Sequence, residues 1–191
     1  MTKKDFKILI ADSDKLIQDV IRSLLSKEGY HVVLANDGFD TMRILKTENI
    51  SLVITTITIS GVDSSEILKY ALRLNPDIAV VLLTTFGNLE TTLQAVKEGA
   101  FDYLTKPFKA EEIIFLAEKA YKRSVLIHEN RELIKNLRDT YHDMEIIKTA
   151  VHSNNPEITL GLIERMERLK TMHVLTDQEV EILRERLVKG V

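Results

Sequence analysis

Several polar residues stand at the ends of short apolar runs, where they could take part in ionic chemistry. In chain order they are Asp12, Ser13, Thr56, Thr84 and Lys106. A carboxylate can hold a hard cation such as Mg²⁺, or it can form an ion pair with an ammonium group. These residues therefore indicate one ionic site, provided that the fold brings the ends of the apolar runs together.

Other kinds of chemistry find little support in the sequence. It contains no cysteine, which excludes disulfides, thiolate metal sites and cysteine nucleophiles. Its five histidines are scattered and do not have the spacing of metal ligands. No nucleophile stands together with a base and an orienting group in a recognisable set. We therefore do not expect an enzyme.

The apolar runs predict five buried strands, because each is rich in Ile, Val and Leu and lacks alternation with polar residues. They are Phe6–Ala11, His31–Ala35, Leu52–Thr55, Ile78–Leu83 and Phe101–Leu104. Stretches with helical spacing follow them, at Leu16–Leu25, Thr41–Lys46, Ser65–Leu74, Leu89–Lys97 and Ala110–Lys119. This alternation predicts an α/β fold, a doubly wound parallel sheet with helices on both sides. In such sheets a functional site forms at the carboxyl ends of the strands.

Longer motifs resemble a known family. The segments ILIADSD, LVITTITISGVD and VVLLTTFGNLETTLQAVKEGAFDYLTKPF, in this order and spacing, are similar to the receiver domains of two-component signalling. The similarity covers roughly residues 5–120 and is strongest over Ala95–Phe108. It implies a flavodoxin-like, five-stranded receiver fold with the strand order 2-1-3-4-5.

The resemblance also implies a phosphorylation site, from which this sequence departs. A typical receiver accepts a phosphoryl group on an aspartate at the end of its third strand, but Thr56 stands there. Two adjacent acids after the first strand help to bind Mg²⁺ in the family, and here they are Asp12 and Ser13, so one carboxylate is missing. Thr84 and Lys106 remain at the positions of the switch hydroxyl and the phosphate-binding lysine. We interpret the domain as a pseudo-receiver that lacks its acceptor.

The remaining site residues allow more than one interpretation. Lys106 is either a remnant of the phosphate site or a solvated or salt-bridged residue near Asp12. Asp12 is a weak candidate for Mg²⁺ binding, and otherwise a helix cap or the ion-pair partner of Lys106. Thr84 is either a switch residue or a strand-end hydroxyl bonded to the backbone. Tyr103 stands at the family's switch-aromatic position, and otherwise is half-buried with its hydroxyl in water. We expect no cofactor, with Mg²⁺ binding weak or lost.

The C-terminal part of the chain predicts further helices. A helical pattern runs from Ala110 to about His152, and an apolar seven-residue repeat lies along it. The repeat consists of Ile113, Leu116, Ala120, Ile127, Ile134, Leu137, Tyr141, Met144 and Val151, with interruptions at Arg123, Asn130 and Lys148. Two short helices, at about 156–171 and 176–189, follow a break at 153–156. We expect a receiver-like domain at 1–122, an extended helix at 123–152 and a helical hairpin at 153–191.

The partners of the chain are predicted from these helices and from the resemblance. The long helix either forms a homodimer with its copy or packs on the hairpin within one chain. The resemblance implies signalling proteins, such as a histidine kinase or an output protein, bound around Asn88–Val96 and Phe101–Lys109. Leu175–Leu183 resembles the opening of a helix-turn-helix, but residues 109–191 hold 14 Lys and Arg against 15 Asp and Glu, so we expect no binding of nucleic acid.

The function that the sequence favours is that of an atypical response regulator in a phosphorelay, acting through phosphorylation-independent protein contacts. A conventional regulator whose acceptor aspartate was replaced by mutation is an alternative, and a DNA-binding regulator is a further one. The start of the chain resembles neither a signal peptide nor a membrane span, so we expect a cytoplasmic protein without membrane insertion.

Overall fold

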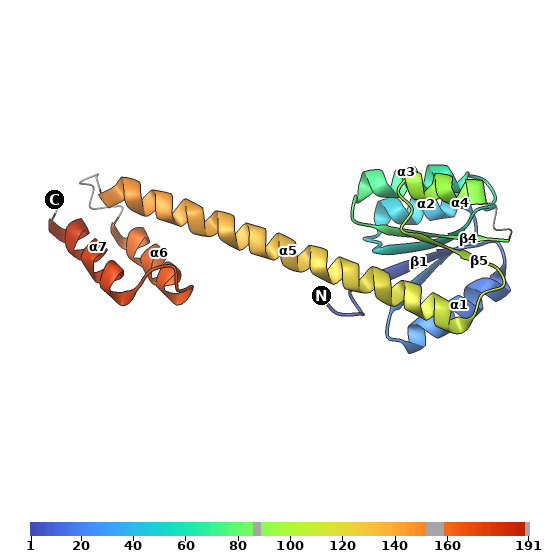
Figure 1. The fold of residues 1–191 in the computed structure, drawn as a ribbon, viewed down its shortest axis with the longest axis horizontal. Helices are drawn as coiled ribbons and strands as arrows, with labels where there is room; N and C mark the ends of the chain where they lie inside the picture. Colours follow the sequence, from blue (N-terminus) through green and yellow to red (C-terminus); the bar gives the residue numbers. More distant parts are fainter. Residues whose placement is uncertain (86–88, 152–158, 190–191) are drawn as a thin grey trace. The chain divides into compact units, whose positions relative to one another are not determined.

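The computed structural model describes residues 1–85, 89–151 and 159–189. The chain divides into two compact units, Met1–His128 and Glu129–Val191, which are described separately. The first unit contains a parallel sheet with the strand order β2-β1-β3-β4-β5 (Figure 1). Its strands are β1 (Lys7–Ala11), β2 (His31–Ala35), β3 (Leu52–Thr56), β4 (Ala79–Thr84) and β5 (Asp102–Thr105). The predicted fold class and strand order are confirmed.

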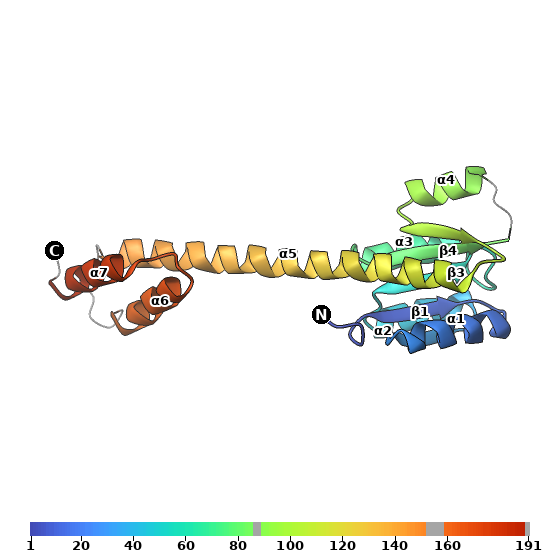
Figure 2. The ribbon, with the colours of Figure 1, turned by 60° about the horizontal axis from the view of Figure 1, so that its bottom comes forward.

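Helices cover both faces of this sheet (Figures 1 and 2). They are α1 (Lys15–Lys27), α2 (Gly38–Thr47), α3 (Ser64–Leu74), α4 (Leu89–Lys97) and the first part of α5 (Ala110–Val151). One core cluster joins α2, α3 and α4 to the sheet, and the other joins α1 and α5 to its opposite face. Because both faces are covered, the central strands are apolar along their whole length, which explains why the sequence shows no alternation there.

Several boundaries differ from the predicted ones by one to three residues. β3 and β4 continue to Thr56 and Thr84, since these residues still pair with the neighbouring strands. α2 begins at Gly38, because the Asp37 side chain accepts a hydrogen bond from the Asp40 amide at 2.7 Å and so caps the helix. Such capping residues lie outside the apolar repeat, so the repeat alone places the helix start too late. Gly29 follows α1 with a φ of 88°, as expected of a glycine that ends a helix.

The second unit is built from the end of α5, α6 (Thr159–Thr171) and α7 (Asp177–Lys189). Its small apolar core contains Ile147, Leu162, Met166, Leu169 and Val180. The predicted break at 153–156 and the C-terminal end of the predicted long helix at His152 lie outside the described residues. In the part of the chain that the structure describes, no helix is both long and apolar enough to cross a membrane.

Polar contacts fix the helices of this unit. The Asp143 side chain is buried on α5, and its carboxylate accepts hydrogen bonds from Arg165, at 2.8 Å, and from Arg168, both on α6. A capping box opens α7: Thr176 Oγ1 accepts from the Glu179 amide, and the Glu179 carboxylate accepts from the Thr176 amide at 2.8 Å. This bond from the backbone lowers the pKa of Glu179.

Candidate functional site

The carboxyl end of the sheet brings Asp12 and Lys106 together, although 94 positions separate them in the sequence. Asp12 follows β1 and Lys106 follows β5. The Lys106 ammonium donates to Asp12 Oδ2 at 2.6 Å. The Asp12 side chain is 3% exposed and that of Lys106 is 14% exposed, so the pair is shielded from solvent. Of the two interpretations of Asp12 as a structural residue, the geometry corresponds to the ion pair with Lys106.

The second oxygen of Asp12 is also engaged. Asp12 Oδ1 accepts a hydrogen bond from the Asp14 amide at 3.0 Å. The Asp14 carboxylate in turn accepts from the amides of Leu16, at 2.9 Å, and Ile17, so it caps α1. Ser13 is exposed between the two acids. Asp14 therefore serves the helix and does not replace the carboxylate that is missing at Ser13.

Gln18 fixes the loop that carries Asp12. Its side chain is buried, and its Nε2 donates to the carbonyl oxygens of Asp12, at 2.5 Å, and Ala35, at 2.7 Å. The Asp12 amide donates to the same Ala35 carbonyl at 3.3 Å. Gln18 was not predicted from the sequence as a residue of this site. A signal was present, because Gln18 stands three residues before Ile21 and seven before Leu25, on the buried face of α1.

The threonines of the site lie at the ends of the central strands. Thr56 is buried at the end of β3, and Thr84 is buried at the end of β4. The Thr84 carbonyl accepts a hydrogen bond from the Lys106 amide at 2.6 Å, which continues the β4–β5 ladder up to the ion pair. The Thr55 hydroxyl, beside Thr56, donates to the Thr56 carbonyl at 3.3 Å. The site residues that were predicted from the sequence thus lie at the ends of four strands, β1, β3, β4 and β5, at one edge of the sheet.

The charge balance of this edge follows from these contacts. Asp12 and Lys106 contribute one negative and one positive charge in direct contact, while Thr56 and Ser13 are neutral. Within the described residues, no group of three or more His, Asp or Glu side chains could hold a metal ion. Both carboxylate oxygens of Asp12 already accept hydrogen bonds, so a cation would have to displace Lys106 from Oδ2. The donor set therefore fits Mg²⁺ poorly, since Mg²⁺ needs several oxygen ligands at short distances.

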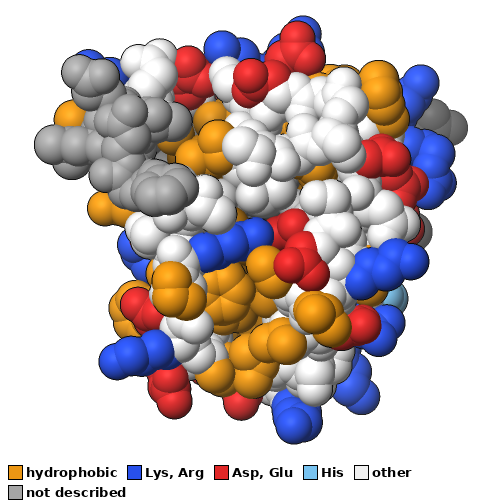
Figure 3. All heavy atoms as spheres, turned by 90° about the vertical axis from the view of Figure 1, so that its right-hand side faces the viewer, with side chains coloured by type: hydrophobic (Ala, Val, Ile, Leu, Met, Phe, Trp, Pro, Cys, Tyr) orange, Lys and Arg blue, Asp and Glu red, His pale blue; other side chains and the backbone are white. Residues whose placement is uncertain are grey.

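Figure 3 shows the end of the first unit where the strands finish. Side chains of both charges adjoin near the middle of this face, and hydrophobic side chains gather below them. Tyr103, on β5, is 42% exposed. This exposure agrees with the half-buried interpretation of Tyr103, while a switching role remains a prediction. The predicted partner segment that starts at Asn88 includes residues that the structure does not describe.

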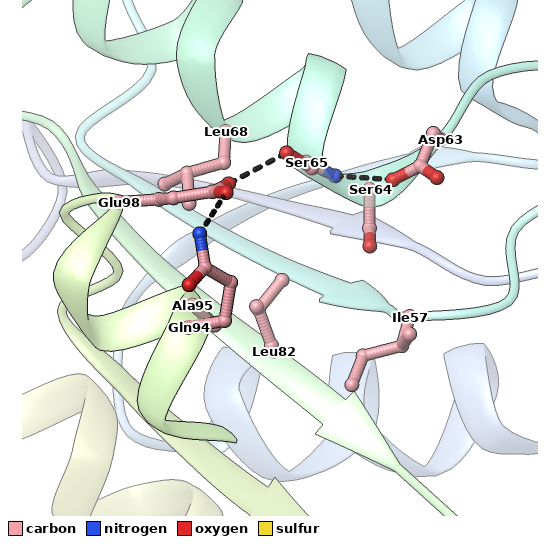
Figure 4. A pocket seen from close by; sticks show the side chains of 9 residues that line it. All are labelled: Ile57, Asp63, Ser64, Ser65, Leu68, Leu82, Gln94, Ala95 and Glu98. Carbon is pink, nitrogen blue, oxygen red and sulfur yellow. Dashed lines mark hydrogen bonds between the residues drawn. The ribbon is translucent and has the colours of Figure 1, made fainter. Parts of the chain in front are cut away.

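A second polar cluster lies between α3 and α4, in a hollow of about 490 Å³ (Figure 4). Glu98 accepts hydrogen bonds from the Ser65 hydroxyl at 2.6 Å and from Gln94 Nε2 at 2.7 Å. Lys69 lies 3.4 Å from the same carboxylate. These contacts, the Ser65 bond foremost, lower the pKa of Glu98. They tie α4 to α3, and nothing in the spacing of these residues along the chain indicates the contact.

Comparisons with known proteins agree with this geometry. The family model for the response regulator receiver domain matches residues 8–118. The chain is 32% identical over 128 residues to the nitrogen assimilation regulatory protein NtrX of Azorhizobium caulinodans, covering 66% of this chain and 28% of that protein. It is 25% identical over 177 residues to the C4-dicarboxylate transport transcriptional regulatory protein DctD of Rhizobium meliloti, covering 92% of this chain and 36% of that protein.

A solved structure gives the same result. A response regulator receiver domain protein from Clostridium thermocellum superimposes with a TM-score of 0.60 and 32% identity, covering 64% of this chain and 98% of that one. The curated relatives are longer: the chain spans 28% of the length of NtrX and 36% of that of DctD.

Proposed function

Because the chain belongs to the response regulator receiver domain family, we propose that it acts in two-component signalling as an adaptor that works through protein contacts without aspartyl phosphorylation. The observation that carries this proposal is the neutral residue at the acceptor position. Thr56 ends β3, and its side chain is a hydroxyl where the family has a carboxylate. The proposal extends the family assignment and rests on the site's chemistry.

The chemistry of phosphoryl transfer supports it. An acyl phosphate forms when a carboxylate oxygen attacks the phosphorus of the donor and the donor's leaving group departs. A threonine hydroxyl is a poor nucleophile at neutral pH unless an adjacent base removes its proton. The only site carboxylate in the described part of the chain, that of Asp12, is occupied by Lys106 and by the Asp14 amide.

Magnesium would supply positive charge to neutralise the transferring phosphoryl group. We propose that the chain binds it weakly or not at all, since Ser13 replaces one carboxylate and Thr56 another. Asp12 alone would remain as a charged ligand, and Lys106 already neutralises it at 2.6 Å. The Lys106 ammonium group thus lies beside Asp12 where a metal ion would otherwise bind.

Exposed hydrophobic side chains support binding of a partner protein. Leu93 and Val96 on α4 are about half exposed, and Tyr103 on β5 is 42% exposed. All three lie in the segments where the family resemblance predicts contacts with a histidine kinase or an output protein. A surface that exposes several large hydrophobic side chains is typical of an interaction site. We further propose that the chain forms a homodimer through its C-terminal helices.

Two other functions compete with this one. A conventional regulator whose acceptor was replaced by mutation would have an otherwise competent site. Transcriptional regulation is suggested by the name of DctD and by the helix-turn-helix-like segment Leu175–Leu183. The similar numbers of acidic and basic residues in 109–191 favour the adaptor over DNA binding.

The deciding experiment measures the intact mass of the protein after incubation with Mg²⁺ and acetyl phosphate. The natural chain is compared with Thr56→Asp and with the double variant Thr56→Asp/Ser13→Asp. We expect no adduct on the natural chain and the strongest labelling on the double variant, because it restores two carboxylates. Thr58→Asp is the matched control, since it adds one carboxylate at an exposed position two residues away.

The outcomes separate the hypotheses. A hydroxylamine-labile phosphoryl adduct on the natural chain would overturn the adaptor proposal and direct attention to Asp12, Asp14 and Asp63 as acceptors. Labelling of Thr56→Asp alone, at the level of the double variant, would mean that the loss is confined to the acceptor. The natural chain would then still be unphosphorylated. The result would support the alternative of a conventional regulator in which only the acceptor was replaced by mutation.

A further inference from the structure

The hollow between α3 and α4 has the size and the lining of a small-molecule site (Figure 4). Its volume of about 490 Å³ lies within the range of such sites, which is about 300–1,000 Å³. Its apolar lining comes from Ile57, directly after β3, from Leu82 on β4 and from Leu68 on α3. Helix α4 adds Ala95. The hollow therefore offers an apolar surface to a ligand, with polar groups along its rim.

The hydroxyl of Ser64 opens into this hollow. Ser64 is the first residue of α3 and is only 5% exposed. Figure 4 shows its side chain pointing away from the helix, toward Ile57 and Leu82. In the part of the chain that the structure describes, this hydroxyl has no hydrogen-bond partner. Because a hydroxyl both donates and accepts, Ser64 can bond to a ligand without first breaking a bond within the protein.

The charged groups of the rim favour a cation. The described residues that line the hollow include two carboxylates, Asp63 and Glu98, and no Lys or Arg. Glu98 is already engaged by the hydrogen bonds that tie α4 to α3, and Lys69 lies 3.4 Å from it. Asp63 uses only Oδ1, which accepts from the Ser65 amide at 2.7 Å. Its other oxygen is available, and Asp63 has no ion-pair partner among the described residues.

We propose that the hollow binds a small organic amine, with a primary ammonium group on an apolar body. The ammonium group donates to the second oxygen of Asp63 and to the Ser64 hydroxyl, which belong to adjacent residues. The apolar body covers Ile57, Leu82 and Ala95. A cavity of about 150 Å³ is enough for benzene, so the hollow has room for a ring with a short aminoalkyl chain. This inference goes beyond the proposed function and does not depend on it.

Titration with three related molecules, followed by ¹⁵N–¹H NMR spectra of the whole chain, tests the class of ligand. 2-Phenylethylamine, 2-phenylethanol and phenylacetate share a ring on a short chain, and at neutral pH they are positive, neutral and negative. At millimolar concentrations we expect the amine to shift the amide signals of Ser64, Ser65 and Ala95. It should bind at least about fivefold more tightly than the alcohol, because hydrogen bonds between charged groups are the stronger ones. Phenylacetate should not bind, since both carboxylates of the rim repel it.

Two variants test the charge and the space separately. Asp63→Asn removes the charge but keeps a side chain that caps α3, so the amine should lose its advantage over the alcohol while the helix stays intact. Glu66→Gln is the matched control, because it removes one carboxylate from the same helix at an exposed position outside the lining of the hollow. Ala95→Leu fills the hollow and should abolish the binding of both molecules. The dispersion of each NMR spectrum shows whether the variant is folded.

The outcomes decide for or against the amine site. Shifts at the hollow that favour the amine, and that Asp63→Asn reduces while Glu66→Gln does not, support it. Equal binding of all three molecules, equal losses in Asp63→Asn and Glu66→Gln, or no shifts at Ser64, Ser65 and Ala95 would each overturn it. A folded Ala95→Leu variant that still binds the amine would do the same. None of these results depends on phosphorylation, so the amine site can fail while the adaptor function stands.

Discussion

The first turns of α5 and its middle carry the same apolar repeat, but their surroundings are opposite. Ile113, Leu116 and Ala120 are buried in the core between α5, α1 and the sheet. Ile134 and Leu137, on the same repeat, are more than half exposed. The spacing of apolar residues therefore predicts that a helix has an apolar face, whereas the neighbours that the fold supplies decide what covers it.

Polar contacts mark the same difference. At the buried start of α5, Lys119 pairs with Asp102 at 2.7 Å, and Arg123 donates to the Asp77 carbonyl at 2.7 Å. Near the other end, the carboxylate of Asp143 is held by two arginines of α6. Both ends of the helix are thus fixed by contacts with other elements. The middle of α5, around Ile134 and Leu137, lies between these two sets of contacts and exposes its apolar side chains.

The largest expected effect distinguishes the buried start of α5 from its middle. Ile113→Ala should lower the free energy of unfolding of the first unit by about 2–5 kcal/mol, because it leaves a cavity in a core position that is 0% exposed. Ile134→Ala should change the free energy of unfolding of the second unit, to which Ile134 belongs, by less than about 0.5 kcal/mol in dilute, monomeric protein. Urea denaturation of both variants measures the difference. Equal losses would mean that the two parts of α5 are not distinct.

A smaller effect is expected at the far end of the helix. Asp143→Ala removes the buried carboxylate that holds Arg165 and Arg168. Both arginines are more than a third exposed and can turn into water, so we expect a loss of about 1–3 kcal/mol, below that of a fully buried pair. Faster amide hydrogen exchange in α6 measures it, with the exposed Glu132→Ala as control. Unchanged exchange would show that the apolar core alone holds α6.

The fold was predictable because its signals are local. Buried strands with no alternation and helical spacing between them gave the α/β class, and family motifs gave the strand order. The Asp12–Lys106 pair was also among the predicted interpretations, because parallel strands place their carboxyl ends at one edge. Thr56 and Thr84 lie at that edge for the same reason.

Contacts between distant side chains were not predictable. Glu98 meets Ser65, 33 positions away, only because α3 and α4 are neighbours on the sheet. Asp143 meets Arg165 only because α6 folds back on α5. Neither pair has a spacing that a helix or strand repeat would reveal. Charged residues on amphipathic helices usually face water, so the burial of Asp143 runs against its residue type.

The smallest expected effect concerns the aromatic cluster that anchors the buried start of α5. The rings of Phe6, Tyr30 and Tyr121 lie 5.6–6.1 Å apart in edge-to-face contacts. The Tyr30 hydroxyl is buried and has no hydrogen-bond partner in the described part of the chain. Burial, with Glu118 and Tyr121 nearby, raises the pKa of Tyr30 to about 12.

A raised pKa of an acid means that the folded state keeps its proton longer than the unfolded state. The stability that the neutral Tyr30 ring contributes is therefore complete below pH 10, the ordinary pKa of tyrosine, and is lost as the pH rises from about 10 to about 12. Urea denaturation at several alkaline pH values should show this decline in the natural chain. Tyr30→Phe keeps the ring and removes the ionisable group, so its decline should be shallower over the same range. If both proteins lose stability in parallel, groups other than Tyr30 govern the alkaline limb, and the aromatic anchor of α5 is held by packing alone.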